Sequence, residues 1–373
     1  MPQAETPRLK ITFLLPLPGT EPIGGFKVVY EYANFLVRRG HSVAVVHPAI
    51  YEIDRPIKSL PLRSAARTIW SYLSHRMTGS FRPRRWFAVD PAVRLLWVPS
   101  LAARFIPDAD IAIATAWQTA EWLAQYPASK GKKFYLLQHL ETWSGPEERV
   151  LATWKLPLQK IVINRWLERI AEELGETSHL VPIGLDFKSF TLTNPPADRD
   201  PNNILMLFQT LAWKGSYDGL AAFALAREQE PALRLTLFSV AERPDDLPAG
   251  IVFHRNPPQE LLRDLYNQAA IFVSPSWAEG FPLPPAEAMQ CGAALAGTDI
   301  PGTAMYAIHG QTALLSPVKN PQAMADNILR LRRDEELRLR LAEAGHALIQ
   351  QFTWSKAGHA LEDILLSGHK LGE

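Results

Sequence analysis

The strongest constraint on the fold of this chain is an alternation of short apolar runs with helical patterns, repeated in two blocks over 373 residues. In the first block, apolar runs at 9–15 and 43–46 flank a helical pattern at 26–39 that ends just before Gly40. Such runs are typical of strands buried on both faces, and a strand–helix–strand crossover implies a parallel sheet. Each block is therefore predicted to form a Rossmann-like unit.

The same patterns predict the remaining elements. In the first block, strands are expected at 111–114, 134–137, 161–163 and 179–182, and helices at 117–125 and 165–174. In the second block, strands are expected at 204–208, 233–238, 271–273 and 293–296, and helices at 217–227, 258–268 and 284–290. The chain is expected to end in helices, with one apolar stripe formed by Leu337, Leu341, Ala344 and Leu348. The polar, Pro-rich stretch 193–201 separates the blocks and is the best linker candidate. We predict an α/β protein of two domains with a cleft between them, where open α/β sheets usually bind ligands.

Composition narrows the class of protein. With 47% hydrophobic and 21% charged residues, the chain has an ordinary soluble globular composition, and a net charge of +1 gives no reason to expect a nucleic acid partner. Cys291 is the only cysteine, which excludes an internal disulfide or a cysteine-based zinc cluster and favours a reducing, cytoplasmic compartment. The apolar run 11–15 is too short for a signal peptide, and no run approaches the roughly 20 residues of a membrane span.

One stretch, 57–105, departs from this neutral balance. It holds a single acid, Asp90, against nine basic residues: Lys58, Arg63, Arg67, Arg76, Arg82, Arg84, Arg85, Arg94 and Arg104. Trp70, Phe81, Trp86, Phe87 and Trp97 lie among these basic residues. Basic residues mixed with aromatics suit an anionic membrane surface, which predicts a peripheral protein at the inner membrane face. The alternative is a solvated loop region with a few core aromatics.

The most informative segment for function is 274–289, which follows a predicted strand and enters a helix. Glu279 lies in the loop, and Glu287 is placed in the first turn of the predicted helix, where Pro284 and Pro285 also fit. Free N–H groups at the helix start, near Gly280 and Phe281, would bind an anion such as a phosphate. Glu287 could then accept hydrogen bonds from ribose hydroxyls and Glu279 from sugar hydroxyls. The alternative is that Glu287 only complements the helix dipole and Glu279 is a solvated loop acid.

The segment Glu279-Gly-Phe-Pro-Leu-Pro-Pro-Ala-Glu287 closely resembles the signature of the retaining GT-B transferases of glycosyltransferase family 4. The resemblance extends over nearly the whole chain. The other matching segments are Gly24-Gly25, 181–186, Lys214-Gly215, 260–266 and 309–315. The resemblance implies two Rossmann-like domains that face each other across a deep cleft, with a C-terminal helix that returns to the first domain.

On this resemblance, residues 1–190 are the acceptor-side domain, 191–201 the linker, 202–352 the donor-side domain and 353–373 the returning helix. Glu287 is expected to bind the ribose, Glu279 the transferred sugar and Lys214 the diphosphate. The backbone of Gly280, Phe281 and Pro282 is expected to approach the sugar. Gly24 and Gly25 are expected near the donor phosphates, and His139 as a sugar ligand or catalytic helper.

The sequence departs from the family pattern in one important place: Gln209 stands where an Arg usually joins the Lys on the diphosphate. The expected reaction is retaining transfer of a hexosyl group from a nucleotide diphosphate sugar to a glycan or lipid-linked glycan in cell-surface polysaccharide synthesis. Neither a metal nor another cofactor is expected. The alternatives are a weakly active or inactive glycan-binding protein and a nucleotide-sugar epimerase.

Overall fold

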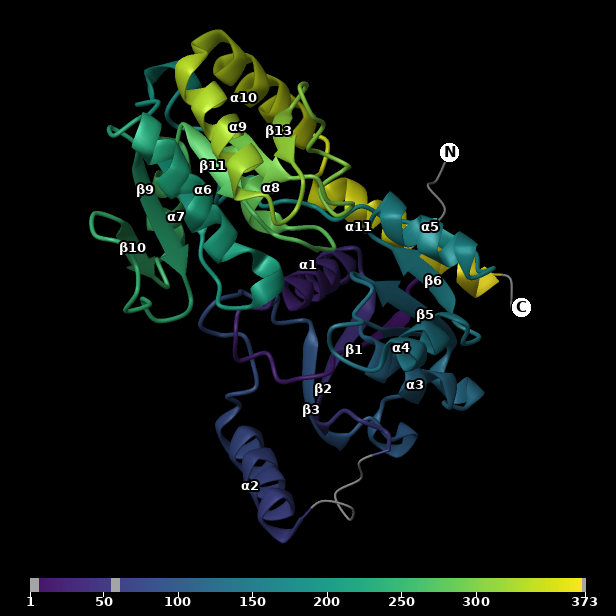
Figure 1. Ribbon diagram of the computed structural model, residues 1–373. Helices are drawn as coiled ribbons and strands as arrows, with labels where there is room; N and C mark the ends of the chain where they lie inside the picture. Colours follow the sequence, from purple (N-terminus) through teal and green to yellow (C-terminus); the bar gives the residue numbers. More distant parts are fainter. Residues whose placement is uncertain (1–6, 55–60, 371–373) are drawn as a thin grey trace, which may run out of the picture. The chain divides into compact units, whose positions relative to one another are not determined.

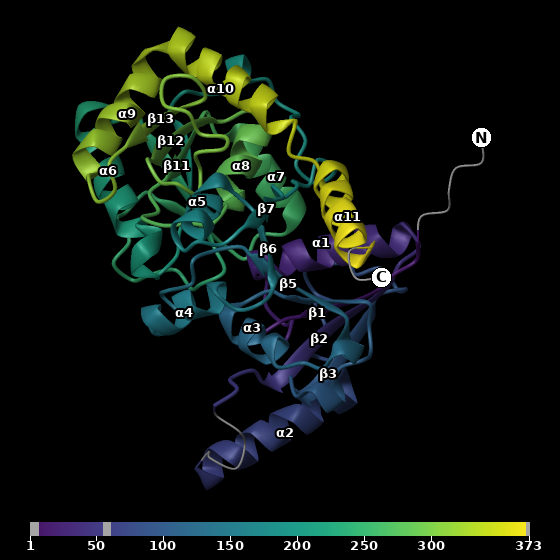
Figure 2. The same cartoon turned by 90° about the vertical axis from the view of Figure 1, so that its right-hand side faces the viewer.

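The computed structural model describes residues 7–54 and 61–370, and these residues form two compact units. The first unit contains the described residues up to Gly184 and those from Trp354 onward, and the second is Leu185–Thr353. Figures 1 and 2 show the elements of both units. Ile57 and Lys58 of the basic stretch lie outside the described residues.

The first unit is built on a seven-stranded parallel sheet with the order β3-β2-β1-β4-β5-β6-β7. Its strands are β1 (Lys10–Leu14), β2 (Ser42–Ile50), β3 (Arg94–Ser100), β4 (Ile111–Ala114), β5 (Lys132–Leu137), β6 (Gln159–Val162) and β7 (Ser178–Leu180). Its helices are α1 (Gly24–Arg38), α2 (Leu62–Thr78), α3 (Trp117–Ala124), α4 (Glu147–Trp154), α5 (Arg165–Glu173) and α11 (Trp354–Lys370). The strand order reverses between β1 and β4, which makes the carboxyl ends of these strands the expected ligand edge.

Helix α11 completes this unit by packing against α1. Buried Glu362 on α11 bonds to Arg39 Nε at 2.9 Å and to His41 Nε2 at 3.0 Å. A Cβ at Gly358 would lie 2.4 Å from the ring of Phe35, so only glycine allows this approach. The C-terminal helix thus packs on the first unit as expected.

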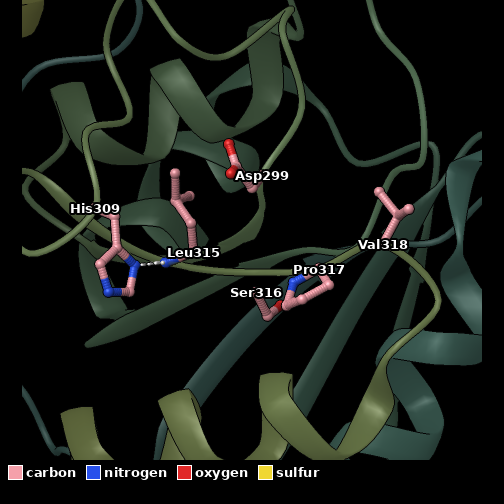
Figure 3. A pocket seen from close by; sticks show the side chains of 6 residues that line it. All are labelled: Asp299, His309, Leu315, Ser316, Pro317 and Val318. Atoms are coloured by element: carbon pink, nitrogen blue, oxygen red, sulfur yellow. Dashed lines mark hydrogen bonds between the residues drawn. The ribbon is translucent and has the colours of Figure 1, made fainter.

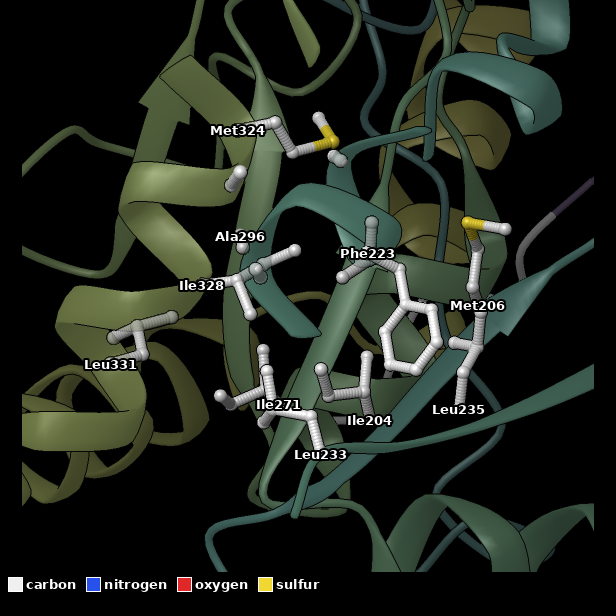
Figure 4. Packing of buried hydrophobic residues seen from close by; sticks show 14 of the residues in the cluster. Ile204, Met206, Phe223, Leu233, Leu235, Ile271, Ala296, Met324, Ile328 and Leu331 are labelled. Atoms are coloured by element: carbon white, nitrogen blue, oxygen red, sulfur yellow. The ribbon is translucent and has the colours of Figure 1, made fainter. Parts of the chain in front are cut away.

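The second unit has a six-stranded parallel sheet with the order β10-β9-β8-β11-β12-β13. Its strands are β8 (Asn203–Leu207), β9 (Arg234–Ser239), β10 (Val252–Arg255), β11 (Ile271–Ser274), β12 (Ala294–Thr298) and β13 (Ala313–Ser316). Its helices are α6 (Ser216–Gln229), α7 (Gln259–Gln268), α8 (Leu283–Gln290), α9 (Pro321–Arg333) and α10 (Glu335–Ile349). Figure 4 shows its core, in which strand residues such as Ile204 and Ile271 pack with Phe223 and Ile328 from the helices.

Every strand and helix named from the sequence patterns is present, with ends that differ by a few residues. Six elements were not predicted: α2, β3, α4, β10, β13 and α9. Within the expected linker, Pro196–Asp198 forms a 3-10 turn, and the Arg199 guanidinium donates to carbonyl oxygens of Tyr266 and Ala269. These bonds attach this stretch to the second unit.

The basic stretch contains a helix and a strand, which corrects the expectation of a solvated loop. No residue of α2 is buried. The helix touches β2 and β3, where Tyr72 stacks on Trp97 at 6.2 Å, and both views show it standing away from the sheet. Phe81 is buried beside Trp97, whereas Trp70 is 72% exposed. The stretch therefore combines core aromatics with an exposed helix.

Candidate functional site

In the second unit, the strand order reverses between β8 and β11, and the loops after these two strands bring Lys214 and Glu279 together. Lys214 Nζ lies 2.7 Å from Glu279 Oε1 and 2.9 Å from Oε2. The side chains are 22% and 13% exposed, so this ion pair is partly withdrawn from water. Ser276 Oγ donates to Glu279 Oε1 at 2.9 Å and fixes the carboxylate further. The pair lies at the edge where open α/β sheets bind ligands.

Two glycines make this arrangement possible. Gly215 has φ +60°, and a Cβ there would lie 2.1 Å from the carbonyl oxygen of Pro275. A Cβ at Gly302 would lie 2.1 Å from the carbonyl oxygen of Glu279. Both contacts are far shorter than a side chain tolerates, so the loops around the ion pair require glycine at these positions.

Trp277 connects the same two loops by hydrogen bonds. The Trp277 N–H donates to the Trp213 carbonyl at 2.7 Å, and the Trp277 indole N–H donates to Asp218 Oδ2 at 2.6 Å. The Lys319 ammonium lies 4.2 Å from the centroid of the Trp277 ring. The loops that carry Lys214 and Glu279 are thus fixed before any ligand arrives.

Glu287 is a buried carboxylate, with 6% of the residue exposed. It accepts a hydrogen bond from the Tyr266 hydroxyl at 3.1 Å. Burial, and then the Glu287 charge, raise the pKa of Tyr266 well above its usual value, so this tyrosine stays a donor. Helix α8 begins at Leu283 and has no acid in its first turn, so the first-turn position predicted for Glu287 is wrong. A carboxylate one turn further in gains little from the helix dipole, which weakens the purely structural interpretation.

The loop residues before α8 are packed rather than open. Phe281 is buried between the rings of Tyr306 and Phe352. The Tyr306 hydroxyl donates to the Pro282 carbonyl at 2.9 Å. Gly280 lies between Glu279 and this anchor, so the backbone of 280–282 has a defined path.

Gln209 lies on the same edge, directly after β8. Its backbone N–H donates to the hydroxyl of buried Ser216 at 2.8 Å. Its side-chain Oε1 is buried with no hydrogen-bond partner among the residues that the structure describes. A neutral amide therefore occupies the place where the resemblance leads us to expect a guanidinium.

In the first unit, Gly24 and Gly25 begin α1, after the loop that follows β1. The Gln138 amide donates to the Gly25 carbonyl at 3.1 Å, and a Cβ at Gly25 would meet the Gln138 side chain at 3.4 Å. The Thr115 hydroxyl donates to the Leu14 carbonyl at 2.7 Å and joins the ends of β4 and β1. These contacts hold the glycine loop at the ligand edge of the first sheet.

His47 anchors the loop between β1 and α1. Its Nδ1 lies 2.7 Å from the Leu17 carbonyl oxygen, and its Nε2 lies 3.2 Å from the Tyr30 hydroxyl. The Trp86 indole N–H donates to the Gly19 carbonyl at 2.9 Å. Burial lowers the pKa of His47 to about 4, although the bond to Leu17 opposes this shift. The ring is therefore neutral at physiological pH and donates its Nδ1 proton to Leu17.

His139 follows β5 and is half-buried between two tryptophans. Its ring centroid lies 6.3 Å from that of Trp143 and 5.8 Å from that of Trp166. Its Nδ1 accepts the Glu141 backbone N–H at 3.2 Å. That bond uses Nδ1 as an acceptor and fixes the ring against the loop that follows β5.

A further hollow of about 380 Å³ lies at the ends of β12 and β13 (Figure 3). Asp299, His309 and Ser316 are among its lining residues, and the His309 Nδ1 accepts the Leu315 N–H at 2.9 Å. Among the described residues, no group of three or more His, Cys, Asp or Glu side chains is placed to hold a metal ion.

Residues 193–347 match the family model described as "Glycosyl transferases group 1". This match lies within the second unit. A solved structure of the Anabaena protein HepE in complex with UDP and glucose superposes with a TM-score of 0.73 at 14% identity, covering 96% of this chain and all of that one. The fold is GT-B.

Curated relatives match the chain over shorter spans. A D-inositol 3-phosphate glycosyltransferase of Streptomyces bingchenggensis is 32% identical over 115 residues, which are 30% of this chain and 25% of the relative. An O-antigen chain mannosyltransferase B of Escherichia coli is 34% identical over 97 residues, which are 26% of this chain and 25% of the relative. The chain spans about a quarter of the length of the first curated relatives that it matches.

The GT-B fold brings together some of the residues named from the sequence and adds others. Lys214 and Glu279 are in direct contact, and Glu287 lies on the helix that follows. Tyr266, Ser276 and Trp277 were missed, although the last two lie inside the segment 274–289. Glu141 and Trp143 were also missed, and their only sequence signal was their position directly after His139.

Proposed function

We propose that this protein is a glycosyltransferase that moves a hexosyl group from a nucleotide diphosphate sugar with retention of configuration. The observation that carries the proposal is the Lys214–Glu279 pair at the strand-order reversal of a group 1 domain, with buried Glu287 on the next helix. UDP is the first nucleotide to test, because HepE was solved with UDP and glucose.

In the proposed reaction, Lys214 stabilises the negative charge that grows on the leaving diphosphate as the glycosidic bond breaks. The backbone N–H groups before α8 add to this stabilisation. Glu287 accepts the ribose hydroxyls, and Glu279 accepts hydroxyls of the transferred sugar. Gly24, Gly25 and His139 keep the roles that the resemblance implies, as predictions. The nucleotide sugar is the co-substrate, and we propose that no metal or other cofactor is needed, so transfer should persist in EDTA.

The Lys214–Glu279 contact has a consequence for donor binding. Both carboxylate oxygens lie within hydrogen-bond distance of the ammonium, so a diphosphate must compete with Glu279 for Lys214. A charge-assisted bond contributes about 1.5–3 kcal/mol. Glu279 then becomes available to sugar hydroxyls when the phosphate takes Lys214, which couples recognition of the two donor parts.

We further propose a glycan or lipid-linked glycan acceptor, in synthesis of a cell-surface polysaccharide at the cytoplasmic face of the membrane. The named activity of the Escherichia coli relative supports a polysaccharide product. No described helix combines the length and apolarity needed to cross a bilayer. Helix α2 instead suits surface binding: it has no acidic residue, it carries Arg63, Arg67 and Arg76, and Trp70 and Met77 are exposed.

Sedimentation with vesicles tests the membrane part. We expect the protein to bind phosphatidylglycerol vesicles and to prefer them over phosphatidylcholine vesicles. The variant Arg67→Glu/Arg76→Glu should lose this preference, whereas Arg227→Glu on α6 should keep it. Equal binding to both vesicle types would contradict the proposed role of α2.

A thermal-shift titration with UDP, GDP, ADP and dTDP tests the transferase itself. A ligand at a hundred times its dissociation constant stabilises the protein by about 2.7 kcal/mol. One nucleotide should stabilise the wild type and not Glu287→Ala, while the exposed control Glu336→Ala should behave as the wild type. Radiolabelled sugar transfer from the matching donor then separates a transferase from an epimerase, which would change the donor without an acceptor.

The partnerless Oε1 of Gln209 favours a second candidate, a glycan-binding protein that retains the fold without activity. If no nucleotide stabilises the protein, the transferase proposal fails and this candidate takes its place.

A further inference from the structure

The loop 138–145, directly after β5, is held in shape by one residue of the neighbouring helix. The Trp117 backbone N–H donates to Glu141 Oε2 at 2.8 Å, and its indole N–H donates to Ser144 Oγ at 3.0 Å. A Cβ at Gly145 would lie 2.5 Å from the Trp117 ring, so glycine allows close packing there. The first residue of α3 therefore contacts the loop at three points.

The loop also has an unfavourable backbone conformation. Glu141 has φ +62°, a region that residues other than glycine rarely adopt. Such conformations persist where the surrounding structure imposes them, and they gather at ligand sites. Here the bonds from Trp117 to the Glu141 carboxylate and from the Glu141 N–H to His139 Nδ1 impose it.

This fixed loop presents a tryptophan to solvent. Trp143 is 58% exposed, and its ring is nearly perpendicular to that of His139, with an interplanar angle of 82°. Trp166, on α5, contacts the same imidazole with an interplanar angle of 85°. An exposed tryptophan on a rigid loop at the ligand edge of a parallel sheet is preorganised for a ligand.

We propose that Trp143, with His139 and Trp166, forms a binding subsite for a neutral hexopyranose of the acceptor. The C–H face of a pyranose ring packs on an indole face, and the indole supplies a large contact area with few rotatable bonds. His139 lies between the two indoles and lines the same subsite. The subsite lies wholly within the first unit, and its assignment as an acceptor subsite rests on the proposed transferase function.

The indole N–H signals of the 15N-labelled protein report on both sites in one spectrum. The sugar probes are the methyl α-glycosides of glucose, mannose, galactose and N-acetylglucosamine, and the nucleotide probe is UDP. We expect at least one glycoside to shift the signals of Trp143 and Trp166, while exposed Trp70 on α2 serves as the control and stays unmoved. UDP should instead shift Trp213 and Trp277, which lie beside Lys214 and Glu279.

Substitutions assign and test the signals. Trp143→Ala should weaken glycoside binding about tenfold, read on Trp166, and Trp143→Phe should retain part of it. Trp70→Ala should change the binding of neither the glycoside nor UDP. The inference is overturned if no glycoside shifts Trp143 or Trp166, or if Trp143→Ala binds as the wild type. Shifts caused by glycosides without any response to UDP, GDP, ADP or dTDP would instead contradict the transferase function and leave a sugar site in place.

Discussion

The two sheets of this protein have the same parallel architecture, yet their ligand edges carry different chemistry. The edge of the second sheet holds charges: Lys214 paired with Glu279, and Glu287 buried beneath a tyrosine hydroxyl. The edge of the first sheet holds glycines and aromatic side chains. The Gly25 carbonyl accepts a hydrogen bond from the Gln138 amide, and His139 lies between two tryptophans. The first set suits a polyanion with hydroxyls, and the second suits a neutral sugar.

This contrast indicates that the fold supplies position and the loops supply chemistry. In both units the residues come from segments that follow neighbouring strands at or next to the reversal of strand order. In the second unit, the charges of Lys214 and Glu279 neutralise each other. The aromatic rings of the first unit form no such ion pair. Sugar binding at the proposed subsite should therefore depend little on salt concentration.

Among the substitutions that test the contrast between the two edges, loss of Glu287 should have the largest effect on ligand affinity. Glu287→Ala removes the proposed ribose acceptor and leaves the buried Tyr266 hydroxyl without that partner. We expect nucleotide affinity to fall at least a hundredfold, about 2.7 kcal/mol. Calorimetric titration with the best nucleotide measures it. Glycoside shifts at Trp143 should persist in this variant, and their loss would break the contrast between the edges.

The Lys214–Glu279 pair should give two opposite results. Lys214→Ala should weaken UDP binding by about ten- to a hundredfold, because a charge-assisted contact to phosphate is lost. Glu279→Gln should tighten UDP binding by a few fold, because the competing carboxylate charge is gone, yet it should lower sugar transfer. Isothermal titration and a transfer assay check both, with exposed Lys188→Ala as the control. Weaker UDP binding in Glu279→Gln would show that the carboxylate only positions the lysine.

In the first unit, His47 should make the free energy of unfolding decrease at acidic pH. Its folded pKa of about 4 lies below the unfolded value of 6.5, so only the unfolded state binds a proton between these values. Stability should therefore fall as the pH drops from 6.5 to 4, by up to about 3 kcal/mol. Urea denaturation of wild type and His47→Gln across this range measures it. A parallel decline in the variant would assign the effect to other groups.

Glu141 should give the smallest effect, with the opposite sign. Desolvation raises the folded pKa of its carboxyl to about 7, above the ordinary 4.5, although the Trp117 N–H lowers it. The folded state then binds the extra proton, so this group makes stability fall as the pH rises from 4.5 to 7. Glu141→Gln should be more stable than the wild type at pH 8 by on the order of 1 kcal/mol, since the amide oxygen can still accept the Trp117 N–H. An unchanged or lower stability at pH 8 would contradict a desolvated carboxylate.

Much of the fold was predictable, because continuous apolar runs and helical spacing come from elements buried in both sheets. Helix α2 was missed because it buries no face and so leaves no regular apolar pattern. The roles of Lys214, Glu279 and Glu287 came from motifs, but the ion pair joins residues 65 positions apart and depends on two loops meeting. Trp143 was missed for the same reason: its role depends on Trp117 of α3, which holds the loop, and on Trp166 of α5, which contacts His139.

The return of the chain through α11 has a consequence for synthesis. The second unit is one continuous stretch, Leu185–Thr353, inserted between the main part of the first unit and its last helix. A ribosome therefore exposes the whole second unit before it exposes Glu362, the partner of Arg39 and His41. The second unit can complete its core while the surface of α1 that receives α11 is still bare. During that interval the nascent first unit is the part of the protein that most needs protection from aggregation.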